Sequence, residues 1–149
     1  MTLLRTPSQT VGPFYSIGLC RRSLTKLDPS GVALRGTLYD GAGEPIRDGM
    51  IELWDAAGGR WGRCGTENDG QFAFRVPEVD HLEVFVFARG LLRHQRTRVY
   101  LAADTAEDDP VLAALPASER QTLVAVNDGG ALRFDVHMQG NRATVFFAH

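Results

Sequence analysis

Short runs of alternating apolar and polar residues fill the stretch from residue 36 to residue 74, and turn-forming residues interrupt them. The interruptions are Gly41, Gly43, Pro45, Gly49, Gly58, Gly59 and Asp69-Gly70. Successive side chains of a strand point to opposite faces, and glycine, proline and aspartate favour tight turns. This pattern is typical of a β-meander, so it predicts an all-β fold.

The same pattern continues along the chain and predicts about eight short strands and one short helix. We expect strands at 32–39, 50–56, 71–75, 81–88, 96–101, 121–126, 131–139 and 144–147. The hairpin turn before the seventh strand is 127–130, with the sequence NDGG. Asp109 as an N-cap and Pro110 at the first helical position predict a helix at 111–115, which Pro116 ends. Short strands without an internal repeat indicate a β-sandwich.

The amino-terminal part of the chain has a different character. Residues 6–19 contain two prolines and two glycines without strand or helix periodicity, yet they carry Phe14, Tyr15, Ile17 and Leu19. We expect an irregular arm whose apolar side chains dock on their own domain or across a partner. A polar connector follows at 20–31. The predicted division is therefore 1–31 for arm and connector, and 32–149 for a single β-sandwich domain.

Composition narrows the possible partners. A chain of 149 residues can bury roughly two-thirds of its unfolded surface in one core. A net charge of -2 argues against a nucleic-acid partner, and no apolar run approaches the roughly 20 residues that cross a bilayer. Cys20 and Cys64 lie in unlike contexts, and no secretory leader is recognisable. We therefore expect a reducing, cytoplasmic location.

The strand at 81–88 has one face that could carry chemistry. Its outward positions hold His81, Glu83, Phe85, Phe87 and, just beyond, Arg89, while the alternate positions are aliphatic and predict core. This outward face is either a pocket wall or a stripe facing solvent or an interface.

Two candidate reactive sites have more ordinary explanations. His81, Glu83 and the distant His137 match the order of a two-histidine, one-carboxylate iron(II) site, but such a pattern arises easily by chance, so a plain surface histidine is favoured. Cys64 follows Arg63, which could activate a thiol, but no histidine lies nearby in sequence. A structural cysteine is the favoured interpretation.

Four separated motifs resemble one family. They are TPSQTVGPF at 6–14, IELWDA at 51–56, FARG at 87–90, and Gly140 with TVFF at 144–147. In this order they resemble the intradiol ring-cleaving dioxygenases, and within them the alpha chains of protocatechuate 3,4-dioxygenase. The resemblance covers nearly the whole chain. It implies a β-sandwich, an assembly of alpha and beta chains, and Fe(3+) held by two tyrosines and two histidines in the catalytic chains.

The chain departs from that ligand set. The resemblance would place the first ligand tyrosine within 56–65 and the second in the loop before His81, and neither segment contains a tyrosine. His81 aligns with the first ligand histidine, but Glu83 takes the place of the second. We therefore expect no metal ligands and no catalytic residues in this chain, and iron carried by a partner beta chain.

A subunit without metal can still shape the substrate pocket. The resemblance implies substrate-binding roles for Thr10, Gly12, Pro13, Phe14 and Arg89. Arg89 offers a planar fork to the carboxylate of a catecholic acid, although it could instead pair with an interface carboxylate. The sequence thus predicts an alpha-like, metal-free subunit of a protocatechuate-cleaving dioxygenase. The alternatives are a non-enzymatic, transthyretin-like binding or structural module and the iron(II) enzyme described above.

Overall fold

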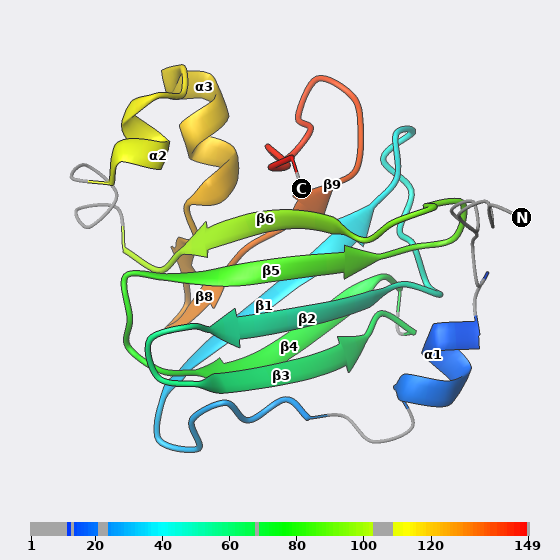
Figure 1. Cartoon of the computed structure of the whole chain (residues 1–149), viewed down its shortest axis with the longest axis horizontal. Coiled ribbons are helices and arrows are strands. Elements are labelled where there is room, and N and C mark those ends of the chain that lie inside the picture. The colour runs from blue at the N-terminus through cyan, green and yellow to red at the C-terminus, as the bar shows by residue number, and fades with distance from the viewer. Residues whose placement is uncertain (1–11, 13, 21–23, 68, 103–108, 149) are drawn as a thin grey trace, which may run out of the picture.

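Strand β1 (Val32–Tyr39) organises the first of two sheets. The computed structural model describes residues 12, 14–20, 24–67, 69–102 and 109–148. The neighbours of β1 are β4 (Gln71–Val76), which is antiparallel, and β8 (Ala131–Arg133) and β9 (Val136–His137), which are parallel. Strand β7 (Val126–Asp128) pairs with β8, so the order is β4-β1-β8-β7. Figure 1 shows β1 crossing behind the second sheet.

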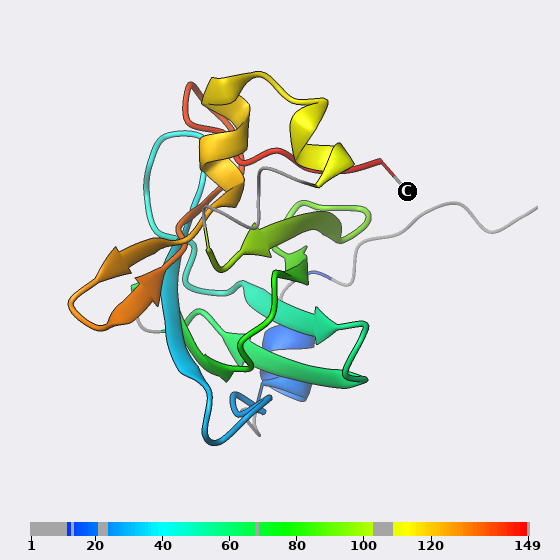
Figure 2. The same cartoon turned by 90° about the vertical axis from the view of Figure 1, so that its left-hand side faces the viewer.

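The second sheet consists of antiparallel neighbours only. Its strands are β2 (Met50–Asp55), β3 (Arg60–Gly65), β5 (His81–Phe87) and β6 (Gln95–Tyr100), in the order β3-β2-β5-β6. Strand β5 therefore has a strand on either side, with β2 paired along 83–87 and β6 along 81–86. The two sheets face one another as two layers (Figure 2).

Alternating side chains of both sheets fill the space between them. Leu34 and Leu38 of β1 and Leu82, Val84 and Val86 of β5 are fully buried. Strand β4 buries every second residue, and β1 does so from Leu34 onward. The prediction of an all-β sandwich, with an aliphatic inner face on β5, is confirmed.

The helical segments are more numerous than predicted. The expected helix begins as predicted, because Asp109 accepts the backbone N–H of Val111 at 2.7 Å and Pro110 opens α2 (Pro110–Ala113). A second helix, α3 (Ala117–Arg120), runs into a 3-10 turn, η1 (Gln121–Leu123). The arm, predicted to be irregular, contains α1 (Phe14–Leu19).

The sequence prediction missed one strand and placed others wrongly. Strand β3 was not predicted because its segment, RWGRCG, has no apolar alternation; it forms by pairing with β2 along its whole length. The strand expected at 121–126 is wrong. Its apolar residue Leu123 is buried against Leu112 and Tyr100 from within a helical turn, and β7 begins only at Val126.

Two carboxy-terminal strands are also shorter than expected. The strand predicted at 131–139 is divided into β8 and β9. Between them, the backbone N–H of Thr37 in β1 donates to the side chain of Asp135 at 3.0 Å, which interrupts the backbone ladder. The segment 144–147 forms no extended ladder. It makes a single bridge from Phe147 to Arg96, and Thr97 donates its hydroxyl to Val145 at 2.6 Å.

The connector packs directly on the sandwich. Leu24 and Lys26 form single bridges with Arg63 and Arg75, and Leu27 is buried in the core. The division at residue 31 stays a prediction. Within the described part of the chain, no helix is long and apolar enough to cross a membrane.

Replacing Leu34 by alanine is expected to lower the free energy of unfolding by about 2–5 kcal/mol, because a fully buried side chain leaves a cavity between the sheets. Urea unfolding measures this loss. The matched control is Leu92→Ala, since Leu92 is 60% exposed and its truncation should cost far less. Equal losses in the two variants would contradict the placement of the core.

Candidate functional site

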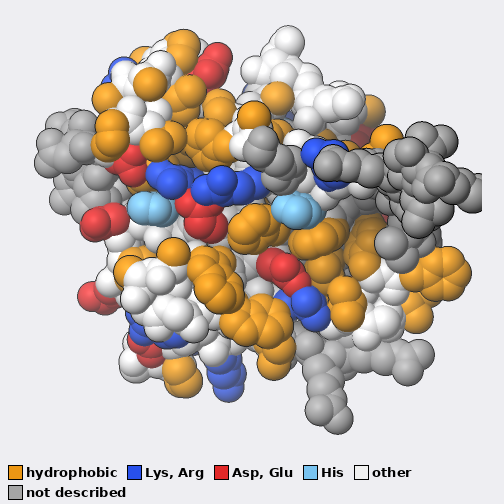
Figure 3. Space-filling model, in the orientation of Figure 1, with side chains coloured by type: hydrophobic (Ala, Val, Ile, Leu, Met, Phe, Trp, Pro, Cys, Tyr) orange, Lys and Arg blue, Asp and Glu red, His pale blue; other side chains and the backbone are white. Residues whose placement is uncertain are grey.

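A buried carboxylate lies at the centre of the outer face of β5. The side chain of Glu83 is only 12% exposed. It accepts hydrogen bonds from Arg96 Nε and Arg98 Nε, both at 2.7 Å, from the neighbouring strand β6. In Figure 3, arginine side chains form a band across this face, with a histidine on either side.

The two arginines decide the charge state of Glu83. Burial alone would raise the pKa of this carboxyl, but the hydrogen bonds and positive charges of Arg96 and Arg98 outweigh it, so the pKa lies below that of a free glutamate. Glu83 is therefore ionised, and its two oxygens are already occupied by guanidinium groups.

The network continues from Arg98 to the first turn of α2. Tyr100 donates its hydroxyl to Asp109 Oδ2 at 2.9 Å, and Arg98 lies 3.5 Å from the same oxygen. The ring of His81 packs against Tyr100 with centroids 5.3 Å apart. Burial opposes ionisation of Asp109, but hydrogen bonds from Val111 and Tyr100 and the charge of Arg98 lower its pKa. The carboxylates of Glu83 and Asp109 thus tie β5, β6 and α2 together.

The iron(II) hypothesis fails on geometry. His81 and Glu83 lie on β5, whereas His137 lies on β9 in the other sheet and stacks on Tyr39 with centroids 4.8 Å apart. Among the described residues, no three His, Cys, Asp or Glu side chains are grouped so that they could hold a metal ion. The structure does not assemble the proposed triad.

Arg89 lies just beyond the end of β5 and forms an ion pair. Its Nε donates to Asp48 Oδ2 at 2.8 Å, and its Nη2 contacts the same oxygen. The Arg89 side chain is 70% exposed and that of Asp48 25%. Arg89 therefore pairs with a carboxylate of its own chain. The sequence did not indicate Asp48 as the partner, because it is 41 residues away.

Helix α1 lies at the same corner. The ring of Tyr15 packs on Phe87, with centroids 6.2 Å apart. Burial, followed by the charge of Asp48, raises the pKa of Tyr15 to about 12, against the opposing charge of Arg89. The hydroxyl of Tyr15 is buried and has no hydrogen-bond partner among the described residues. Helix α1 therefore lies beside the Arg89–Asp48 pair.

The predicted substrate-binding residues divide into two groups. Gly12, with a φ of +67°, and Phe14, which is 69% exposed, lie at the start of α1, near the corner that Arg89 occupies. Thr10 and Pro13 lie outside the described residues. The substrate-binding role of all five positions stays a prediction.

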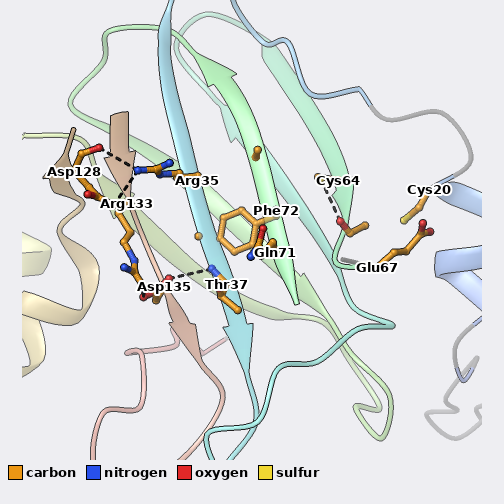
Figure 4. A pocket seen from close by; sticks show the side chains of 13 residues that line it. Cys20, Arg35, Thr37, Cys64, Glu67, Gln71, Phe72, Asp128, Arg133 and Asp135 are labelled. Atoms are coloured by element: carbon orange, nitrogen blue, oxygen red, sulfur yellow. Dashed lines mark hydrogen bonds and ion pairs between the residues drawn. The ribbon is translucent and has the colours of Figure 1, made fainter. Parts of the chain in front are cut away.

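A groove on the other sheet is lined by arginines that are already paired. It has a volume of about 650 Å³ and is lined by β1, β4 and the β7–β8 hairpin (Figure 4). Arg35 pairs with Asp128 at 3.0 Å, and Arg133 pairs with Asp135 at 2.8 Å. Its guanidinium groups are thus already neutralised by carboxylates of the same chain.

The two cysteines show no activation. Cys20 and Cys64 are both free thiols. Burial raises the pKa of each, and Cys64 donates its S–H to the carbonyl of Gly65 at 3.2 Å. A thiol with a raised pKa is a poor nucleophile at neutral pH. This agrees with the interpretation of Cys64 as structural.

Two curated relatives match nearly the whole chain. The protocatechuate 3,4-dioxygenase alpha chain of Burkholderia cepacia is 36% identical over 193 aligned positions, which cover 98% of this chain and 98% of the relative. A match of this identity and coverage is enough to show family membership. It is a member of the protocatechuate 3,4-dioxygenase alpha-chain family. The alpha chain of the same name from Pseudomonas putida is 32% identical over 194 positions and covers 97% and 96%.

This membership confirms the prediction of an alpha-like dioxygenase subunit, and the non-enzymatic module is not favoured. Both alignments are longer than the 149 residues of this chain, so these alpha chains carry segments that it lacks. A scan against models of protein families gives no match.

The fold has a counterpart of known structure. The dioxygenase domain of a dioxygenase carbohydrate-binding protein fusion from Streptomyces sp. SirexAA-E superimposes with a TM-score of 0.58 at 22% identity. The superposition covers 91% of this chain and 98% of that domain. The similarity supports the sandwich architecture.

Replacing Glu83 by glutamine is expected to lower the free energy of unfolding by about 1–3 kcal/mol at pH 7, because two partly buried guanidinium groups lose their counter-charge. The pKa of Glu83 is lowered in the fold, so the stabilisation is present above its unfolded pKa of about 4.3 and disappears as the pH falls through the folded pKa. Urea unfolding between about pH 7 and pH 3 should show the gap between wild type and variant closing.

The matched control is Glu78→Gln, which removes an exposed carboxylate from the loop before β5. It should leave stability nearly unchanged across this range. A loss in Glu83→Gln that stays constant with pH would show that the ionised carboxylate is not what stabilises the face.

Proposed function

We propose that this chain completes the substrate pocket of an iron-bearing beta chain, in a cytoplasmic hetero-oligomer that converts protocatechuate and O₂ into 3-carboxy-cis,cis-muconate. The observation that carries the proposal is the corner where Arg89 and helix α1 meet at the end of β5. The names of the curated relatives support the reaction and the existence of a second type of chain.

Arg89 suits the carboxylate of an aromatic acid. A guanidinium presents planar, bidentate donors that match a carboxylate, and it stays charged at any physiological pH. Because the side chain is 70% exposed and lies just beyond the end of β5, it can contact a ligand held by another chain. In this role Arg89 binds and orients the substrate, and it takes no part in bond cleavage.

The outer face of the second sheet suits a protein partner. Trp54 and Trp61 face each other across β2 and β3, and both are more than 40% exposed. Phe85 and Phe87 continue the aromatic surface on β5, where they contact the ring of His94. Exposed tryptophan and arginine side chains are enriched at the centres of protein interfaces. We place the beta chain on this face, next to Arg89.

The proposal leaves iron chemistry to the partner. The two catechol oxygens of the substrate would chelate iron held by the partner, and this iron would supply the activation toward O₂. On this chain, the surroundings of Glu83 do not favour a cation, because Arg96 and Arg98 already place two positive charges on its oxygens. The two free cysteines fit a reducing compartment.

Arg89→Ala in the co-expressed hetero-oligomer is expected to raise KM for protocatechuate about tenfold or more, with iron content unchanged, because the charged contact to the carboxylate is lost. Steady-state oxygen uptake and metal analysis measure the two quantities. Arg93→Ala is the matched control, since Arg93 is an exposed arginine in the same loop. Equal activity of the beta chain with and without this protein would refute the pocket-completing role.

Metal analysis tests where iron resides. Iron in the purified hetero-oligomer is expected to follow the amount of beta chain, and this chain purified alone should hold none. His81→Ala should leave the iron content of the hetero-oligomer unchanged, because His81 packs against Tyr100 and no metal-binding group of side chains is present among the described residues. Stoichiometric iron in the isolated chain, lost on this substitution, would place a metal site here.

A further inference from the structure

Arg89 uses only one edge of its guanidinium in the ion pair with Asp48. A single carboxylate oxygen, Asp48 Oδ2, accepts from both Nε and Nη2, which is a side-on contact. A guanidinium has five N–H donors in a fixed plane, so the edge formed by Nη1 and Nη2 remains for a second acceptor. Among the described residues, no other acceptor of Arg89 is recorded.

The backbone around Arg89 does little to fix its side chain. The residue lies in a tight turn after β5, where the N–H of Leu91 reaches the carbonyl of Ala88 at 3.3 Å and Gly90 has a φ of +87°. A long side chain exposed at such a turn samples many rotamers unless another group holds it. Its direction therefore depends on Asp48.

Asp48, in contrast, lies in a turn that hydrogen bonds to a buried threonine hold in place. The hydroxyl of Thr66, a fully buried residue, donates to the carbonyl of Ile46 at 2.6 Å and accepts the N–H of Gly49 at 2.9 Å. The backbone N–H of Thr66 also donates to the carbonyl of Gly49 at 3.0 Å. These three hydrogen bonds bracket Asp48 on both sides and fix its backbone immediately before β2.

We propose that Asp48 is a positioning residue that holds Arg89 side-on, so that the Nη1–Nη2 edge faces the carboxylate of the substrate. This inference rests on the proposed function, which makes Arg89 a substrate contact. Thr66 fixes the turn, the turn fixes Asp48, and Asp48 fixes the direction of the guanidinium. The substrate carboxylate then meets an ordered fork and does not have to displace an internal partner.

An electrostatic effect of Asp48 would change the affinity for the substrate in the opposite direction. Asp48 carries a negative charge near the site of the substrate carboxylate, so its removal could strengthen the attraction of Arg89 for that carboxylate. Asparagine at this position keeps an oxygen that can accept from Nε and Nη2 but loses the charge. Alanine loses both. Comparison of the two variants therefore separates position from charge.

In the hetero-oligomer, Asp48→Ala is expected to raise KM for protocatechuate about threefold to tenfold with little change in kcat, the range expected for ordering one long side chain on binding. Asp48→Asn should stay within about twofold of the wild type. The inhibition constant of catechol, which has no carboxylate, should not change in either variant. The control is Asp128→Ala, which removes an ion pair with Arg35 on the other sheet.

A second measurement needs no partner chain. Nitrogen-15 NMR of the full chain reports the exchange of the Arg89 Nε–H with water, and this hydrogen is bonded to Asp48. Its exchange rate should rise about threefold to tenfold in Asp48→Ala and change less in Asp48→Asn. An exchange rate that is the same in all three proteins would show that Asp48 does not order Arg89.

The outcomes separate this inference from the proposed function. If Arg89→Ala leaves KM unchanged, Arg89 does not contact the substrate and the proposed function fails at that residue. If Arg89→Ala raises KM but both Asp48 variants lower it, charge neutralisation dominates and the positioning role is wrong. If Asp48→Ala has no effect on KM while Arg89→Ala does, the guanidinium is ordered by other means and the inference is again wrong.

Discussion

Strand β5 can direct only every second side chain into the core between the sheets, and this alternation determines what the outer face of its sheet must carry. Leu82, Val84 and Val86 fill the core, so His81, Glu83, Phe85 and Phe87 are directed away from it. The register with β2 and β6 is fixed over most of the strand, and a shift by one residue would move the charged side chains into the core. The position of Arg89, two residues after the end of the strand, follows from the same register.

Glu83 shows how such a face tolerates a carboxylate with little access to water. A buried charge is costly unless it is paired and hydrogen-bonded, and here the pairing comes from alternate residues of β6. Arg98 extends the network to Tyr100 and Asp109, and Asp109 also caps α2. Glu83 therefore joins β5 to β6, and Arg98 extends this network to α2. Chemistry that requires a metal must be supplied from outside this network.

The sequence predicted those parts of the fold in which local pattern and tertiary packing agree. Strand β1 was predicted to the residue, and the inner face of β5 was assigned correctly. Strand β3 was missed because pairing with β2, not its own alternation, makes it a strand. The segment around Leu123 was predicted to be a strand because its apolar residues resemble those of a strand. Its packing against α2 cannot be read from the sequence alone. The candidate site shows the same limit: FARG identified Arg89, but nothing local connects it with Asp48.

The exposed Arg89–Asp48 pair cannot be explained by stability. Ion pairs in which one partner is largely exposed contribute about 0–1 kcal/mol, and holding a long side chain in one geometry offsets part of that. The buried Thr66 hydroxyl nevertheless holds the Asp48 turn with hydrogen bonds on both sides. A rigid carboxylate that orders an exposed guanidinium adds little to folding, but it lowers the entropy that the guanidinium loses when it binds an acceptor. If Arg89 binds the substrate as we propose, binding is the step at which this arrangement has an effect, and we expect the acceptor to approach from the side that Asp48 leaves open.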